Sequence, residues 1–193
     1  MTSAALVMTA LFALSDGNAV DANARPKGQL DPNTPAGKVA DILSEELFFN
    51  IQNFAYDYNK VGPQHPATGH ERIKAEGYKG QIRAALKGLT VEVPCTVEVL
   101  PTVNNPNKKQ IVATANDGKS VPGFVVYFRA ATFIDATDKA SQDRVAQSTF
   151  TMKVNLDTAK VYFPIIDKYP PNYPFVCFYI EQTVDMKDVK PKK

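Results

Sequence analysis

The spacing of the apolar residues changes at Gly88, and this change constrains the fold more than any other feature of the chain. Before Gly88, apolar residues recur every three or four positions, which is the period of an amphipathic helix. After Gly88 they alternate with polar residues, as in a strand that buries one face. The sequence therefore predicts an α+β fold in which helices come first and an antiparallel β-structure follows.

Two helices are expected before Gly88. The first begins at Thr34-Pro35, an N-cap followed by proline at the first helical position, and ends before Gly62-Pro63. We expect one helix of about six turns with Leu47 and Phe54 in the core. A weaker helix follows over 70–87, with Gly88 as its C-terminal stop. The apolar stripe of the first helix consists of Val39, Ile42, Leu43, Leu47, Ile51, Phe54, Ala55 and Tyr58.

The strands follow the period-two pattern. Pro94 interrupts the first of them and implies a bulge or an edge. The segments on either side of Leu156-Asp157 are expected to form a hairpin, and the last strand is apolar on both faces, which predicts burial. We expect strands at 89–99, 109–115, 123–134, 147–155, 159–165 and 175–180, and a short helix within 137–146.

Two architectures fit this order of elements. The favoured one is an antiparallel barrel of the OB type, whose long first strand bends. The alternative is a strongly curved, cone-shaped antiparallel sheet that clasps the long helix around a ligand cavity. Both place the two helices before the sheet.

A length of 193 residues predicts a single domain, which we place at 35–185. Residues 25–34 have two prolines, a glycine and no periodicity, so we expect a linker there. Residues 186–193 are rich in lysine and are expected to form a solvated basic tail.

The N-terminus resembles a secretory leader in pattern. Residues 4–14 are largely apolar, and Ala22-Asn23-Ala24 offers small residues for a signal peptidase, although no basic residue precedes the apolar run. We therefore expect residues 1–24 to be a signal peptide and the protein to be exported. The apolar run is too short to span a bilayer, so no transmembrane segment is expected.

Cys95 and Cys177 are the two cysteines of the chain. In an exported protein they are compatible with one disulfide bond. Because both lie in apolar strand patterns, two buried thiols are the alternative.

No metal site or cofactor is expected. The two histidines, His65 and His70, lie in a loop rich in Gly and Pro beside Glu71, and a zinc site needs three or four converging ligands. Gly118-Lys119-Ser120 ends like a phosphate-binding loop, but Ala113 stands where the motif needs its first glycine.

No set of catalytic residues is recognisable either. Cys95 lies in an apolar strand rather than at a helix N-terminus that would stabilise a thiolate. The acidic residues are expected to be solvated rather than gathered in a cleft. Those considered as acid–base pairs are Glu45, Glu46, Asp135, Asp138 and Asp143. Whether the chain is an enzyme stays open, and the sequence favours a protein without catalytic activity.

One group of residues favours binding. If the apolar residues of their strands point inward, Tyr127, Arg129, Lys153, Lys160 and Tyr162 share the outer face of the sheet. Aromatic rings among cations suit a platform for single-stranded nucleic acid or sugar. They are also typical of an ordinary solvent-exposed sheet face.

The sequence favours an exported, non-catalytic binding or assembly module of the cell envelope or extracellular space. Its 22 basic and 20 acidic residues give a net charge of only +2, so a protein partner or small ligand is favoured over nucleic acid. One alternative is an enzyme with a pocket between the 35–60 helix and the sheet. Another is a structural subunit that uses the Phe175–Ile180 strand as a contact.

Overall fold

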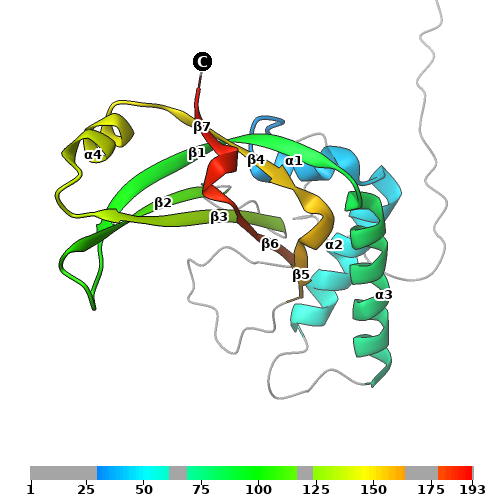
Figure 1. Cartoon of the computed structure of the whole chain (residues 1–193). Coiled ribbons are helices and arrows are strands. Elements are labelled where there is room, and N and C mark those ends of the chain that lie inside the picture. The colour runs from blue at the N-terminus through cyan, green and yellow to red at the C-terminus, as the bar shows by residue number, and fades with distance from the viewer. Residues whose placement is uncertain (1–29, 61–68, 117–123, 164–177, 193) are drawn as a thin grey trace, which may run out of the picture.

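The computed structural model describes residues 30–60, 69–116, 124–163 and 178–192, which form helices and one mixed sheet (Figure 1). The α+β prediction, with helices before the sheet, is confirmed. The helices are α1 (Pro35–Ile42), α2 (Glu45–Lys60), α3 (Gly69–Leu86) and α4 (Lys139–Ala146), with the 3-10 turns η2 (Leu156–Thr158) and η3 (Met186–Asp188). The strands are β1 (Thr90–Pro101), β2 (Lys108–Asn116), β3 (Phe124–Asp135), β4 (Phe150–Asn155), β5 (Lys160–Tyr162), β6 (Phe178–Val184) and β7 (Val189–Pro191).

The first helix is broken, so the prediction of one continuous helix is wrong. It begins as predicted, with the Thr34 hydroxyl accepting the Gly37 N–H at 3.1 Å. Leu43 then adopts an extended conformation, with ψ of 143°. The chain starts a second helix at once, because the Ser44 hydroxyl accepts the Leu47 N–H at 3.2 Å and acts as a new N-terminal cap.

This break decides which residues of α2 reach the core. Phe48, Ile51 and Ala55 are buried, whereas Leu47 and Phe54 are only partly buried and pack against the core from its margin. The prediction that Leu47 and Phe54 are core residues therefore holds only in part. The cap at Ser44, rather than the direction of α1, determines which face of α2 is turned towards the core.

The described part of the predicted linker is anchored to the domain. Leu30 is buried, and the Asp31 carbonyl accepts hydrogen bonds from the N–H and the hydroxyl of Thr34. Gly37 lies so close that a Cβ built on it would stand 1.9 Å from the Asp31 carbonyl oxygen. Only glycine fits at position 37 without moving this turn.

The seven strands have the order β5-β6-β3-β2-β1-β4-β7. All neighbouring pairs are antiparallel except β3 and β6, which are parallel. The expected purely antiparallel structure is thus corrected to a mixed sheet. Because the sheet is not closed, the barrel of the OB type is not confirmed.

The sheet turns along β1, which pairs with a different partner in each half. Residues 90–95 pair with β4, and residues 96–101 pair with β2. Ala115 and Asn116 of β2 continue to pair with β3 beyond the point where β1 has left. Pro94 lies in the half of β1 that has a ladder on one side only, which is how the strand tolerates its missing N–H.

The predicted hairpin around Leu156-Asp157 does not form. β4 pairs with β1 and β7, whereas β5 pairs with β6, so η2 leads the chain from one half of the sheet to the other. η3 leads it back from β6 to β7 (Figure 1). Because β7 pairs with β4, the described residues of the expected basic tail, 186–192, include an edge strand.

An aromatic cluster forms the centre of the core. The ring of Phe48 on α2 contacts Phe124 of β3 and Phe178 of β6, at centroid distances of 5.5 and 6.2 Å. Phe124 and Phe178 are stacked at 4.4 Å. These rings occupy the interface at which the enzyme alternative placed a pocket. α4 lies far from α1–α3, at the other end of β1 (Figure 1).

Candidate functional site

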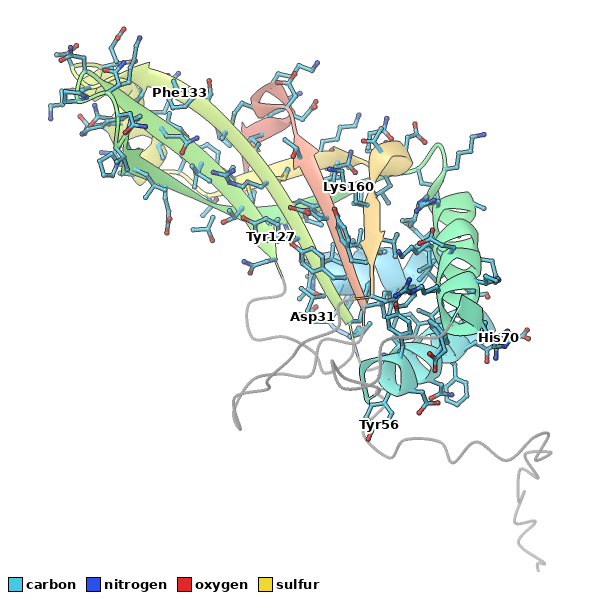
Figure 2. The ribbon with its side chains drawn as sticks, turned by 90° about the horizontal axis from the view of Figure 1, so that it is seen from below. Asp31, Tyr56, His70, Tyr127, Phe133 and Lys160 are labelled. Carbon is cyan, nitrogen blue, oxygen red and sulfur yellow. The ribbon has the colours of Figure 1, made fainter. Side chains whose placement is uncertain are left out.

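Three of the five predicted binding residues gather on one side of the sheet. Lys160 and Tyr162 on β5 and Tyr127 on β3 alternate with buried neighbours, so their side chains lie on the face opposite the core. Figure 2 shows Tyr127 and Lys160 on nearby strands at this end of the sheet. Arg129 and Lys153 also alternate with buried neighbours, but they lie farther away, and a binding role for any of the five stays a prediction.

β6 joins them into one surface. Glu181 of β6 lies opposite both Lys160 and Tyr127, and Tyr179 lies opposite Tyr162. The rings of Tyr162 and Tyr179 have centroids 6.0 Å apart. We refer to this surface as the tyrosine face, defined by Tyr127, Lys160, Tyr162, Tyr179 and Glu181.

Tyr179 and Glu181 were missed by the sequence prediction, which treated the last strand as apolar on both faces. In the described strand, Phe178 and Ile180 are buried while Tyr179 and Glu181 are half-buried on the other side. The alternation of Phe178 and Ile180 with Tyr179 and Glu181 was the available signal. It was obscured because the predicted strand began at Phe175 and ended at Ile180.

Tyr179 of the tyrosine face is a neutral phenol at physiological pH. Burial raises the pKa of Tyr179 to about 12, and the charge of Glu181 and the nearby Tyr127 and Tyr162 phenols add to this effect. A neutral phenol donates and accepts hydrogen bonds, and its ring offers a flat apolar surface. This combination favours binding chemistry over proton transfer near neutral pH.

The other two predicted residues lie outside the tyrosine face. Arg129 lies further along β3, exposed and opposite Thr183 and Thr114, so it borders the surface. Lys153 lies on β4, opposite Glu92 of β1, in the other half of the sheet. The prediction placed β4 and β5 in one hairpin, and without that hairpin Lys153 is not brought beside Lys160.

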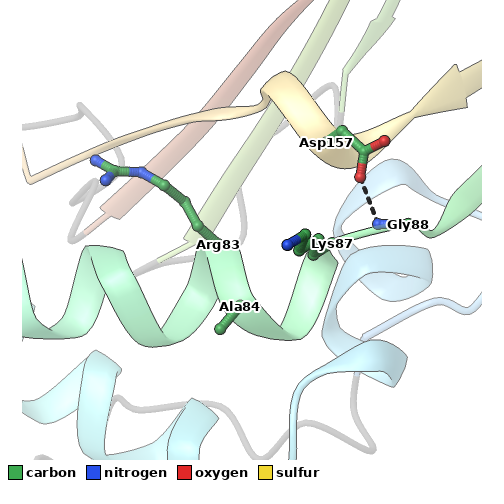
Figure 3. Close-up of a pocket in the computed structure, with 5 residues that line it drawn as sticks. All are labelled: Arg83, Ala84, Lys87, Gly88 and Asp157. Atoms are coloured by element: carbon green, nitrogen blue, oxygen red, sulfur yellow. Dashed lines mark hydrogen bonds between the residues drawn. The ribbon is translucent and has the colours of Figure 1, made fainter.

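A pocket of about 410 Å³ lies elsewhere, between the end of α3 and η2. It is lined by Arg83, Ala84, Lys87, Gly88 and Asp157, none of which was predicted as a site residue. The Asp157 carboxylate accepts a hydrogen bond from the Gly88 N–H (Figure 3). Gly88 has φ of +75°, the left-handed conformation expected of a glycine that ends a helix.

The described residues offer no metal centre. His70 is exposed at the start of α3, and His65 lies outside the described residues. In the part of the chain that the structure describes, no three His, Cys, Asp or Glu side chains are close enough to hold a metal ion.

Three of the candidate catalytic residues, Cys95, Asp135 and Asp138, are buried or bonded in ways that stabilise the fold. Burial raises the pKa of the Cys95 thiol to about 11, the opposite of what an activated nucleophile needs. Asp138 caps α4 by accepting the Ser141 N–H at 3.0 Å, and this bonding lowers its pKa. Asp135 pairs with Lys108 at 2.8 Å.

Cys177 and Gly118-Lys119-Ser120 lie outside the described residues, so the predicted disulfide bond stays a prediction.

None of the helices within the described ranges combines the length and apolar character needed to cross a membrane. Comparisons of this chain with protein-family models, curated proteins and solved structures found no match.

Proposed function

We propose that this chain is an exported, non-catalytic binding protein that holds a protein partner on the tyrosine face. The observation that carries the proposal is the placement of Tyr127, Tyr162 and Tyr179 on three adjacent strands. Tyrosine is enriched at the energetic centres of protein interfaces, because its ring contributes a large contact area and its hydroxyl a hydrogen bond.

The buried residues beneath the tyrosine face also favour a role in partner binding. Val126, Val161 and Ile180, which alternate with the tyrosines along β3, β5 and β6, are buried in the core. A binding surface on strands fixed by a packed core loses little conformational entropy when a partner binds. Lys160 and Arg129 give the region two positive charges beside Glu181, so we expect the partner to present acidic groups.

Export is part of this proposal, and the support for it comes from the N-terminal sequence. The apolar run 4–14 and the triplet Ala22-Asn23-Ala24 support cleavage of residues 1–24. N-terminal sequencing of the native protein should begin at Arg25. A native protein that still starts with the apolar run would contradict this part of the proposal.

Binding is favoured over the two alternatives. The enzyme alternative requires a pocket between α2 and the sheet, where the rings of Phe48, Phe124 and Phe178 are in contact. The structural-subunit alternative requires an apolar contact surface on the Phe175–Ile180 strand, but Phe178 and Ile180 are buried in the chain's own core, and of its described residues only Tyr179 faces outward.

Site-specific photocrosslinking in the native host tests the proposal and identifies the partner. A photoreactive amino acid would replace Tyr162 or Tyr179 in turn, and Ile73 in the control. Ile73 is a suitable control because it is 73% exposed and lies on α3, outside the strands β3, β5 and β6 that carry the tyrosine face. We expect the same protein adduct from both tyrosine positions and none from position 73. An adduct at all three positions, or at none, would contradict the proposal.

A further inference from the structure

We propose that the pocket between α3 and η2 binds a small oxyanion, with phosphate or carboxylate as its charged group. This inference is independent of the proposed function of the tyrosine face. It depends on the charges that line the pocket and on how its walls are held in place.

Two cations line the pocket at the C-terminal end of α3. Arg83 lies in the last turn of α3 and Lys87 in the turn that follows it, and the Arg83 side chain extends away from Lys87 (Figure 3). Within the described part of the chain, neither residue forms an ion pair. An anion bound in the pocket would therefore be attracted by two cations that no carboxylate neutralises through an ion pair.

The carboxylate in the pocket offsets only one of these two positive charges. Asp157 accepts the Gly88 N–H, and this hydrogen bond satisfies part of its negative charge. Two cations against one carboxylate leave a net charge of about +1 at the pocket. A guanidinium fork and an ammonium group that line one pocket can each bind oxygens of an oxyanion.

The walls of the pocket are fixed before any ligand binds. Besides the bond between Asp157 and Gly88, the Leu156 N–H donates to the Leu89 carbonyl at 2.9 Å. The Asp157 N–H donates to the Asn155 side chain at 3.0 Å. These bonds hold η2 against the turn from α3 to β1. The pocket has a volume of about 410 Å³ and is open to solvent, since all five residues that line it are exposed.

Cations at the C-terminal end of a helix also stabilise the helix when no ligand is bound. Arg83 and Lys87 lie near the C-terminal end of α3, where positive charge interacts favourably with the helix dipole. Under that explanation alone, the pocket has no affinity for anions. The test must therefore detect binding rather than the stability of the unliganded protein.

The test is the rise in Tm of the full chain with increasing inorganic phosphate or succinate, at constant ionic strength. Three proteins are compared: the wild type, the double variant Arg83→Ala/Lys87→Ala, and the matched control Arg72→Ala/Lys74→Ala. The control removes the same charge from exposed positions of the same helix, outside the pocket. It also corrects for the general stabilisation of proteins by phosphate.

We expect the wild type and the control to gain roughly 3–6 °C in Tm when the anion is at about ten times its Kd. The pocket variant should lack this saturable gain. In NMR, the Gly88 amide resonance of the wild type should shift with the same Kd. A response to phosphate alone identifies a phosphoryl group as the ligand, and a response to succinate alone identifies a carboxylate. Equal responses in all three proteins, or none in the wild type, would overturn the proposal.

Discussion

Gln52 is a polar side chain in the core that α2 presents to the sheet. It is 3% exposed, and its amide nitrogen has no hydrogen-bond partner within the described structure. Burying an amide donor without a partner is destabilising. We predict that Gln52→Leu raises the free energy of unfolding by about 1 kcal/mol, measured by urea denaturation.

Gln142 on α4 provides the matched control. Its amide nitrogen donates to the Ala136 carbonyl at 3.0 Å, and its oxygen accepts from Lys109 at 2.7 Å. The same replacement there, Gln142→Leu, removes two hydrogen bonds and should lower the free energy of unfolding by about 1 kcal/mol. If both variants change stability in the same direction, the account of Gln52 is wrong.

Tyr179 should make the protein sensitive to alkaline pH. Its pKa is about 12 in the folded protein and 10.0 in the unfolded reference, so the folded state holds its proton more tightly. The associated stability is present below about pH 10 and is lost as the pH rises towards 12. We predict that Tyr179→Phe weakens this loss, measured as urea unfolding at several pH values in that range. An unchanged pH dependence in Tyr179→Phe would contradict the shift.

At the scale of elements, the break between α1 and α2 determines which side chains stabilise the fold. Phe48 contacts two buried phenylalanines, whereas Leu47 is partly exposed. We predict that Phe48→Ala lowers the free energy of unfolding by about 3–5 kcal/mol and Leu47→Ala by less than about 2 kcal/mol. Urea denaturation of both variants checks the order. A larger loss from Leu47→Ala than from Phe48→Ala would contradict the break and support the continuous helix that the sequence predicted.

Local patterns predicted the elements well where the signal was local. Thr34-Pro35 marked the start of α1, Gly88 marked the end of α3, and the period-two pattern after Gly88 located β1. The break at Leu43 was missed because the apolar stripe continues across it. Ser44 followed by Glu45 and Glu46 is a recognisable start of a helix, and it was the signal that could have located the break.

Strand pairing was not predictable in the same way, because it depends on residues far apart in the chain. Leu156-Asp157 was interpreted as a hairpin turn, although it lacks the Asn-Gly or Asp-Gly signal that favours one. The segment instead forms η2, held by the bond between Asp157 and the distant Gly88. The parallel pairing of β6 with β3 likewise has no local signature.

At the scale of the whole molecule, this pairing explains how much of the candidate site the sequence could predict. Tyr127, Lys160 and Tyr162 were found because alternation alone places them on the outer face. Alternation also places Lys153 on the outer face, but it was expected beside Lys160 because β4 and β5 were assumed to be neighbours. Tyr179 was missed because its strand was interpreted as apolar on both faces. The pocket at Arg83 and Lys87 could not be predicted, because η2 and α3 meet only in the folded chain.

In the function proposed above, the tyrosine face binds a partner rather than stabilising the fold. Two chains are compared, and both carry a photoreactive residue at position 179 that reports contact with the partner. One chain retains Tyr162, and the other carries Tyr162→Ser. The most direct measurement is the adduct yield of these two chains beside their free energies of unfolding. We predict a yield lower by about tenfold or more in the variant, with unfolding changed by less than about 1.5 kcal/mol. An unchanged yield, or a loss that only follows the loss of folded protein, would contradict the claim.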